Sequence, residues 1–117
     1  MTNIAINGFG RIGRLILKAG INNKKLRFVA INDLTDPGTL AHLLRWDSVH
    51  GKFPGTIKAE KDSIIVNGKE IKVTAEKDPK KLPWKKLKVD VAVECTGIFR
   101  KYQECQMHIK AGAKKVI

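Results

Sequence analysis

Cysteine is scarce in this sequence: only Cys95 and Cys105 occur among 117 residues, and their spacing is not that of a metal site. No secretion signal precedes the first predicted strand, so both thiols are expected to stay reduced. No apolar run is long enough to cross a bilayer, and internal repeats and low-complexity segments are missing. These absences argue against a disulfide scaffold and a membrane protein, and they favour a cytoplasmic domain.

Acidic residues are also few. The 23 Lys and Arg outnumber the 11 Asp and Glu, which gives a formal net charge of +12. Such a charge would suit a polyanion such as nucleic acid. However, the lysines are dispersed, and their densest cluster, residues 80–88, is interrupted by apolar residues. A lysine-rich solvated surface is the favoured interpretation, and nucleic acid is not expected as a partner.

The hydrophobic pattern of the first half predicts one α/β unit. A strand over residues 3–7, a helix over 11–22 and a strand over 26–32 have the length and order of a βαβ unit, whose strands are expected to be parallel. A second helix is predicted over 37–45, with Asp36 as its N-cap.

The second half predicts antiparallel strands followed by a return to parallel ones. The three short strands are predicted at residues 56–59, 64–66 and 71–73. Asn67 and Gly68 form a strong hairpin signal between two of them. The apolar run 89–95 is typical of a buried parallel strand, a helix is predicted over 101–111, and residues 116–117 begin another apolar run. The predicted fold class is a Rossmann-type, doubly wound, mostly parallel sheet with an inserted antiparallel hairpin, truncated at its C-terminus.

The strongest functional signal is a Gly-x-Gly-x-x-Gly sequence from Gly8 to Gly13, between the first strand and the first helix. Gly8 permits a tight turn, Gly10 lets a pyrophosphate approach the backbone, and Gly13 lets helix and strand pack closely. Free amides at the helix start, including those of Arg11 and Ile12, would point at the phosphates, and the helix dipole favours their charge. The less favoured alternative is a glycine turn with a structural role only.

An acid stands at the position that this motif requires. Asp33 follows the second strand, about twenty residues after the glycines. Its carboxylate could accept hydrogen bonds from the adenosine ribose and would repel a 2′-phosphate, so NAD is predicted as the cofactor rather than NADP. The alternative role, capping the next helix, suits Asp36 better.

A third group of candidates follows the later parallel strand. Thr96 and Gly97 would lie at its carboxyl end, where open α/β sheets bind ligands, and Phe99 could cover one side of the adenine. A plain strand-to-helix turn with a core phenylalanine fits these residues nearly as well. No Cys, His and acid are spaced in a way that indicates a nucleophile, so no catalytic residue is predicted in this chain.

Taken together, these residues resemble the phosphorylating glyceraldehyde-3-phosphate dehydrogenase family. The matching segments are residues 6–14, 29–34, 43–53, 76–79, 82–84, 94–99 and 111–117. Because the similarity runs the whole length of the chain, the resemblance implies that residues 1–117 are the N-terminal part of an NAD-binding domain. The family's catalytic domain is then expected to be missing from this chain.

The resemblance also assigns expected roles to individual positions. Arg11 and Ile12 resemble the family's pyrophosphate-binding pair, and Asp33 resembles its ribose acid, with Asn32 beside it. Lys77 occupies a cofactor-side position where the family often has Arg; a lysine keeps the charge but not the planar guanidinium. Thr96, Gly97 and Phe99 resemble the residues that form the wall on the adenine side of the family's cofactor site.

For the parent protein, the resemblance implies a cytosolic, tetrameric glycolytic enzyme. The family's reaction consists of thiolate attack on glyceraldehyde 3-phosphate, hydride transfer to NAD, and phosphorolysis of the thioester by inorganic phosphate. The catalytic Cys, in a Ser-Cys-Thr-Thr-Asn segment, and its activating His do not occur in this chain, which is therefore expected to be inactive alone. Two alternatives remain. One is the sister enzyme erythrose-4-phosphate dehydrogenase, which tends to carry Glu at the position of Asp33; the other is a non-catalytic module that binds NAD or RNA.

Overall fold

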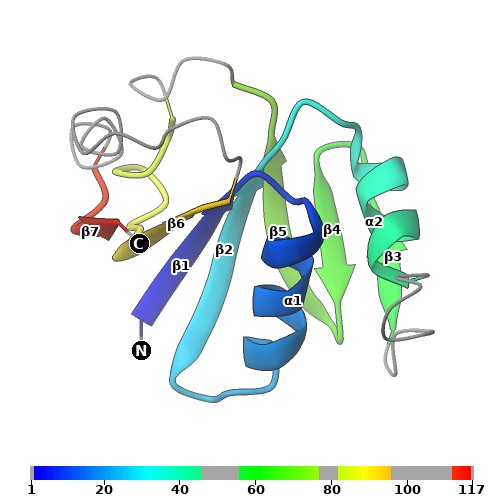
Figure 1. Cartoon of the computed structure of the whole chain (residues 1–117), viewed down its shortest axis with the longest axis horizontal. Coiled ribbons are helices and arrows are strands. Elements are labelled where there is room, and N and C mark those ends of the chain that lie inside the picture. Colours follow the sequence, from blue (N-terminus) through cyan, green and yellow to red (C-terminus); the bar gives the residue numbers. More distant parts are fainter. Residues whose placement is uncertain (1, 46–55, 77–81, 96–111, 117) are drawn as a thin grey trace.

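The computed structural model describes residues 2–45, 56–76, 82–95 and 112–116 (Figure 1). Along these residues the elements are β1 (Thr2–Asn7), α1 (Arg11–Gly20), β2 (Leu26–Asn32), α2 (Pro37–Arg45), β3 (Ile57–Ala59), β4 (Ser63–Val66), β5 (Lys69–Thr74), β6 (Val91–Glu94) and β7 (Lys115–Val116). The predicted helix over 101–111 lies outside the described residues. No helix among the described residues has the length and apolar character needed to cross a membrane.

All seven described strands form one sheet in the order β3-β4-β5-β2-β1-β6-β7. β5, β2, β1, β6 and β7 run parallel to one another, whereas β3, β4 and β5 are paired antiparallel. The predicted α/β fold with a mostly parallel sheet and an antiparallel hairpin is confirmed. β5 belongs to both parts, because it pairs antiparallel with β4 on one side and parallel with β2 on the other (Figure 1).

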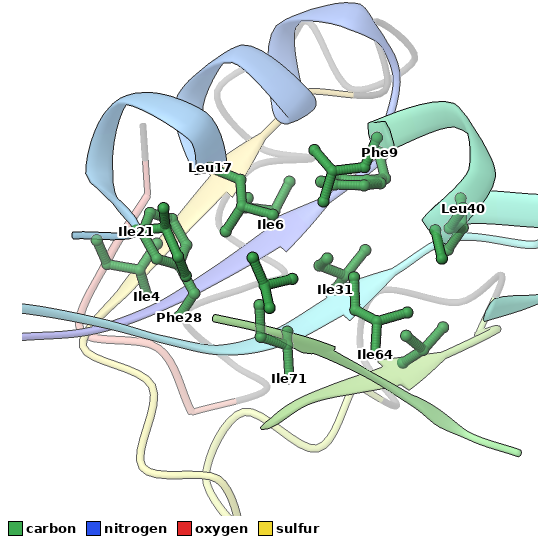
Figure 2. Packing of buried hydrophobic residues seen from close by; sticks show 14 of the residues in the cluster. Ile4, Ile6, Phe9, Leu17, Ile21, Phe28, Ile31, Leu40, Ile64 and Ile71 are labelled. Atoms are coloured by element: carbon green, nitrogen blue, oxygen red, sulfur yellow. The ribbon is translucent and has the colours of Figure 1, made fainter. Parts of the chain in front are cut away.

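The core lies on both faces of this sheet because successive side chains of a strand point to opposite faces. Ile4 and Ile6 of β1 join a large cluster with Leu17 of α1 and Leu40 of α2, so both helices cover the same face (Figures 1 and 2). Ala5 faces the other way. It belongs to a smaller cluster that the segment around Trp84 covers, whose buried members are Ala5, Ala30, Leu82, Trp84, Val89, Ala92 and Ala113.

Helix boundaries follow local hydrogen bonding. α2 begins as predicted, because the backbone amide of Thr39 donates to Oδ2 of Asp36 across 3.0 Å, as expected of an N-cap. α1 ends at Gly20, two residues before the predicted end at residue 22. There the amide of Asn23 donates to the carbonyl of Gly20, so a tight turn replaces the continuing helix.

The predicted strand over 89–95 is shorter in the structure, where β6 covers Val91–Glu94. The amide of Val89 instead donates to the carbonyl of Trp84, within the turn that precedes the strand. The run at 116–117 was predicted to begin a strand, and β7 at Lys115–Val116 pairs in parallel with β6.

Candidate functional site

The chain turns sharply between β1 and α1, at the carboxyl edge of the parallel sheet. Gly8 adopts a φ of 92°, which L side chains rarely adopt, as the predicted tight turn requires. Its amide donates to the carbonyl of Asn32 across 2.8 Å and so fastens the turn to the end of β2. The side chain of Phe9 is only 1% exposed and lies among the core residues (Figure 2). The buried side chain of Phe9 and the hydrogen bond from Gly8 to Asn32 therefore hold the turn against the sheet.

Gly13 allows α1 to approach this turn closely, as the sequence predicted. A Cβ atom at Gly13 would lie 2.6 Å from the carbonyl oxygen of Gly8 and 3.1 Å from a methyl carbon of Ile6. Both are closer than real Cβ atoms comfortably come, and the nearer one is backbone. The third glycine of the motif therefore serves the packing of helix on turn.

Gly10 differs from its two neighbouring glycines. It is the N-cap of α1 with φ −80° and ψ −161°, which any residue can adopt, and a Cβ atom there would meet no atom of the described residues within 4 Å. Neither backbone strain nor internal packing thus requires a glycine at this position. The space beside Gly10 is open, which is what close approach of a ligand to the backbone needs.

Within the described residues, the start of α1 carries backbone donors without a hydrogen-bond partner. The amides of Arg11 and Ile12 cannot bond within the helix, and no described side chain caps them. The first turn also contains no acidic residue, so nothing on the helix itself offsets the positive end of its dipole. The side chain of Ile12 is 63% exposed. This end of the helix is suited to bind an anion.

Asp33 lies against the glycine turn. Its Oδ2 atom accepts a hydrogen bond from the amide of Phe9 at 2.8 Å, and its Oδ1 atom accepts one from the amide of Thr35 at 3.0 Å. Each carboxylate oxygen can accept a second bond, so the half-buried group keeps capacity for a ligand's hydroxyl groups. The structure thus places the acid and the glycine turn together.

Asn32 is the centre of a chain of side-chain hydrogen bonds along the same edge. Its Nδ2 atom donates to Oδ1 of Asn7 and to the carbonyl of Glu76, and its Oδ1 atom accepts from Oγ1 of Thr74 and from the amide of Glu76. These four bonds use both donors and both acceptor positions of the amide. Asn7 in turn donates to Oε2 of Glu94. The ends of β1, β2, β5 and β6 are therefore linked side by side.

Two further residues at this edge were not singled out from the sequence. Asn7 is one, and an amide that ends an otherwise apolar strand could have marked it. Leu34 is the other: it directly follows Asp33 and its side chain is 61% exposed. A large apolar side chain exposed to solvent beside a candidate ligand-binding acid indicates a binding surface, and this exposure is seen only in the structure.

The remaining predicted residues, Lys77, Thr96, Gly97 and Phe99, lie outside the described residues. The residues that directly precede them in the described part, Glu76 before Lys77 and Cys95 before Thr96, both lie at the carboxyl edge of the sheet. The carbonyl of Glu76 accepts from Asn32, and the amide of Cys95 donates to the carbonyl of Asn7.

Cys95 shows no sign of activation. Burial raises the pKa of its thiol above the ordinary value, and the negative charge of Glu94 raises it further. A thiol with a raised pKa is a poor nucleophile at neutral pH. Among the described residues, no group of three His, Cys, Asp or Glu could hold a metal ion.

Comparisons with known proteins agree with this geometry. Residues 2–102 match the family model described as "Glyceraldehyde 3-phosphate dehydrogenase, NAD binding domain". Over its whole length, the chain is 58% identical to glyceraldehyde-3-phosphate dehydrogenase of Thermotoga maritima and 55% identical to that of Clostridium pasteurianum, covering 36% and 35% of those proteins. Over 97% of its length it is 52% identical to glyceraldehyde-3-phosphate dehydrogenase 1 of Bacillus subtilis, of which it covers 34%.

The chain thus spans about a third of the length of the curated relatives that it matches. Its matched region takes in the glycine turn, Asp33 and the amide chain around Asn32. The family model covers more than four-fifths of the chain, from residue 2 to residue 102. The chain therefore belongs to the glyceraldehyde 3-phosphate dehydrogenase family, as part of its NAD binding domain.

Proposed function

We propose that the carboxyl edge of the parallel sheet holds NAD with its pyrophosphate on the start of α1. The open space at Gly10 supports this most directly, because the described part of the fold gives no reason for a glycine there. The unpaired amides of Arg11 and Ile12 would donate to the phosphate oxygens, with the helix dipole adding to their attraction.

The adenosine half would extend from there towards β2. Asp33 would accept hydrogen bonds from the ribose hydroxyls, and its charge would disfavour a 2′-phosphate. The exposed side chains of Ile12 and Leu34 would supply apolar contacts on either side. Asn32 would act mainly by holding Asp33 and the strand ends in place, since its side-chain amide already makes four hydrogen bonds.

The residues outside the described part complete the proposal. Lys77 would add a positive charge on the cofactor side, and Thr96, Gly97 and Phe99 would form the wall on the adenine side. Sequence resemblance supports these four roles, together with the position of Glu76 and Cys95 at the same edge.

For the protein that carries this chain, we propose the reaction named by its relatives: oxidation of glyceraldehyde 3-phosphate with inorganic phosphate, in the cytoplasm and as a homotetramer. NAD would supply the hydride acceptor. This chain's residues would bind and orient the cofactor and carry out none of the covalent steps, in keeping with the unactivated thiol of Cys95. The relatives reported above are glyceraldehyde-3-phosphate dehydrogenases, which favours this enzyme over its erythrose-4-phosphate sister.

The test compares three glycine-to-alanine variants by NAD titration calorimetry and urea unfolding. Gly10→Ala should weaken NAD binding by about tenfold or more, because a methyl group would occupy the phosphates' space, while stability changes by less than about 1 kcal/mol. Gly13→Ala should destabilise the fold, since its Cβ atom would meet the Gly8 carbonyl. Gly38→Ala, in the first turn of α2, is the matched control and should leave NAD affinity unchanged. Wild-type NAD affinity in Gly10→Ala would refute the proposed pyrophosphate site.

The proposed reaction is tested separately, by measuring NADH formation. In the protein that carries this chain, formation of NADH from glyceraldehyde 3-phosphate should depend on inorganic phosphate, and erythrose 4-phosphate should be the poorer substrate. NAD binding without any such turnover would support a binding module instead.

A further inference from the structure

Two Asn-Gly dipeptides occur in this chain, and the structure places them at opposite ends of the sheet. Asn7–Gly8 belongs to the glycine turn at the carboxyl edge, whereas Asn67–Gly68 forms the turn between β4 and β5, beside the loop that joins α1 to β2 (Figure 1). Asparagine before glycine is prone to spontaneous deamidation, because glycine has no side chain to hinder its backbone nitrogen. The two pairs are the same in sequence, so a difference in their reactivity must come from the fold.

Deamidation takes place within the dipeptide and consumes only water. The backbone nitrogen of the glycine forms a bond to Cγ of the asparagine, the bond from Cγ to Nδ2 breaks, and Nδ2 leaves as ammonia with the proton of the glycine amide. Water then opens the resulting succinimide at either carbonyl, which yields aspartate or isoaspartate. The attack therefore needs a carboxamide that is free to turn and a glycine amide that is not held in a hydrogen bond.

Asn7–Gly8 is held at every group that this reaction uses. Asn7 is only 3% exposed, its Nδ2 atom donates to Oε2 of Glu94, and its Oδ1 atom accepts from Nδ2 of Asn32. The amide of Gly8 donates to the carbonyl of Asn32 across 2.8 Å. Attack at Asn7 would thus require several bonds of one buried network to break together.

Asn67–Gly68 is held much less firmly. Oδ1 of Asn67 accepts from the amide of Thr56 at 3.1 Å, Nδ2 donates to Oδ1 of Asn22 at 3.2 Å, and both bonds are exposed to water. Gly68 is exposed, and a Cβ atom there would meet no atom of the described residues within 4 Å. Within the same part of the chain, the amide of Gly68 has no hydrogen-bond partner. Only the two side-chain bonds of Asn67 restrain its carboxamide there.

The β4–β5 turn must open before the attack, and this opening is local. Asn67 has a φ of 52° and Gly68 a φ of 79°, as in a tight hairpin turn. Nζ of Lys69, the first residue of β5, donates to the carbonyl of Ile21 across 2.8 Å, so the strand stays attached while the tip opens. An exposed tip with few contacts opens at a much lower free energy than a buried network does.

We propose that Asn67 is a site of spontaneous deamidation in the folded chain, and that the fold protects Asn7. Conversion to aspartate removes the donor to Asn22 and adds a negative charge, and isoaspartate also adds a carbon atom to the backbone of the turn. Either product would loosen the hairpin tip from the loop after α1. Because the glycine turn lies at the other end of the sheet, NAD affinity should not change.

The test incubates the folded chain in mildly alkaline buffer and follows both asparagines by peptide mapping with mass spectrometry. Asn67 should deamidate at least about tenfold faster than Asn7, because its turn opens at lower free energy. In urea the two should react at similar rates, since glycine follows both. An isoaspartyl methyltransferase would label the isoaspartate product. Equal rates in the folded chain would overturn the proposal, and so would an intact Asn67 under conditions in which the unfolded chain reacts.

A matched pair of loop variants tests the restraint on the carboxamide. Asn22→Ser removes the group that Nδ2 of Asn67 reaches, so deamidation at Asn67 should become faster by about twofold or more. Asn23→Ser, at the next position, keeps a side-chain oxygen for the amide of Lys25 and should leave the rate at Asn67 unchanged. Equal rates at Asn67 in the two variants would refute the proposed restraint.

Asn67→Asp reproduces one product and tests its consequence. This variant should unfold at a lower urea concentration than the wild type and bind NAD with the same affinity. Weaker NAD binding by the folded variant, or unchanged stability, would refute the proposed consequence. The result with Gly10→Ala bears only on the glycine turn, so the deamidation site and the cofactor site stand or fall separately.

Discussion

The amide of Phe9 donates a hydrogen bond to Oδ2 of Asp33 across 2.8 Å, and this bond joins the glycine turn to the tip of β2. The acid that is proposed to recognise the ribose thus also positions the loop that is proposed to recognise the pyrophosphate. On this proposal, one carboxylate would serve both the fold and the ligand site. Variants at this position must be measured for both.

We predict that Asp33→Asn reduces the preference for NAD over NADP. The amide keeps the size of the carboxylate but loses the charge that repels a 2′-phosphate, so the ratio of the two dissociation constants should fall by about tenfold. Calorimetric titration of one variant with both nucleotides gives this ratio, in which any loss of folding cancels. An unchanged ratio would remove Asp33 from the ribose site.

Asp33→Ala should instead lower stability, by about 1–3 kcal/mol, because the amides of Phe9 and Thr35 both lose their acceptor. Urea unfolding measures this loss. If Asp33→Ala is as stable as the wild type, the hydrogen bond to Phe9 does not hold the turn.

Asn32→Ala is predicted to be among the more damaging polar substitutions in the chain. It would remove the hydrogen bonds of Asn32 to Oδ1 of Asn7, Oγ1 of Thr74 and the backbone of Glu76, at a cost of about 1–3 kcal/mol for each buried group that water cannot reach. Thr74→Val removes only one of the four bonds and should cost less. Equal free energies of unfolding for the two variants would contradict this ranking.

The carboxyl group of Asp90 should make stability depend on pH. The backbone amide of Asn3, followed by the side chain of Lys114, lowers its pKa below the ordinary value of 3.8. A lowered folded-state pKa means that the stabilisation is complete above the ordinary pKa and is lost as the pH falls through the folded value. The stability difference between wild type and Asp90→Asn should therefore be constant near neutral pH and shrink in acid.

Lys114→Ala separates the two causes. Because the hydrogen bond from the amide of Asn3 is the largest single cause of the lowered pKa of Asp90, part of the acid dependence should survive this substitution. Urea unfolding from about pH 7 to about pH 3 tests both variants. Loss of the whole acid dependence in Lys114→Ala would show that the ion pair dominates.

Cys95 is predicted to react slowly with iodoacetamide. Its pKa is raised by burial and by the charge of Glu94, so the thiolate fraction at neutral pH is small. Alkylation should be about tenfold slower in the native chain than in the same chain unfolded by urea. Peptide mapping by mass spectrometry distinguishes Cys95 from Cys105. Equal rates in the two states would refute the effect of burial.

The sequence predicted the fold well where one local rule determined the structure. The glycine turn, the Asp36 cap of α2 and the Asn67–Gly68 hairpin each depend on a few neighbouring residues, and all three formed as expected. The end of α1 was predicted too late because the apolar spacing continues to Ile21, whereas a turn bond from Asn23 to Gly20 ends the helix.

What the sequence could not supply was contact between distant residues. Asn32 was expected beside a ligand, but its amide bonds to groups 25 to 44 positions away, and no local pattern encodes that. The double pairing of β5 was likewise invisible, since alternation predicts a strand but not its neighbours.

The position of β5 between two differently oriented neighbours restricts how this hairpin can change during evolution. Inserting or deleting a single residue in the Asn67–Gly68 turn would shift β5 by one step against β4 and move Ile71 and Val73 to the opposite face of the sheet. Because β5 also pairs with β2, the error would spread into the parallel sheet next to Asp33. We therefore expect natural length variation in this hairpin to spare its tip, or to come in steps of two residues.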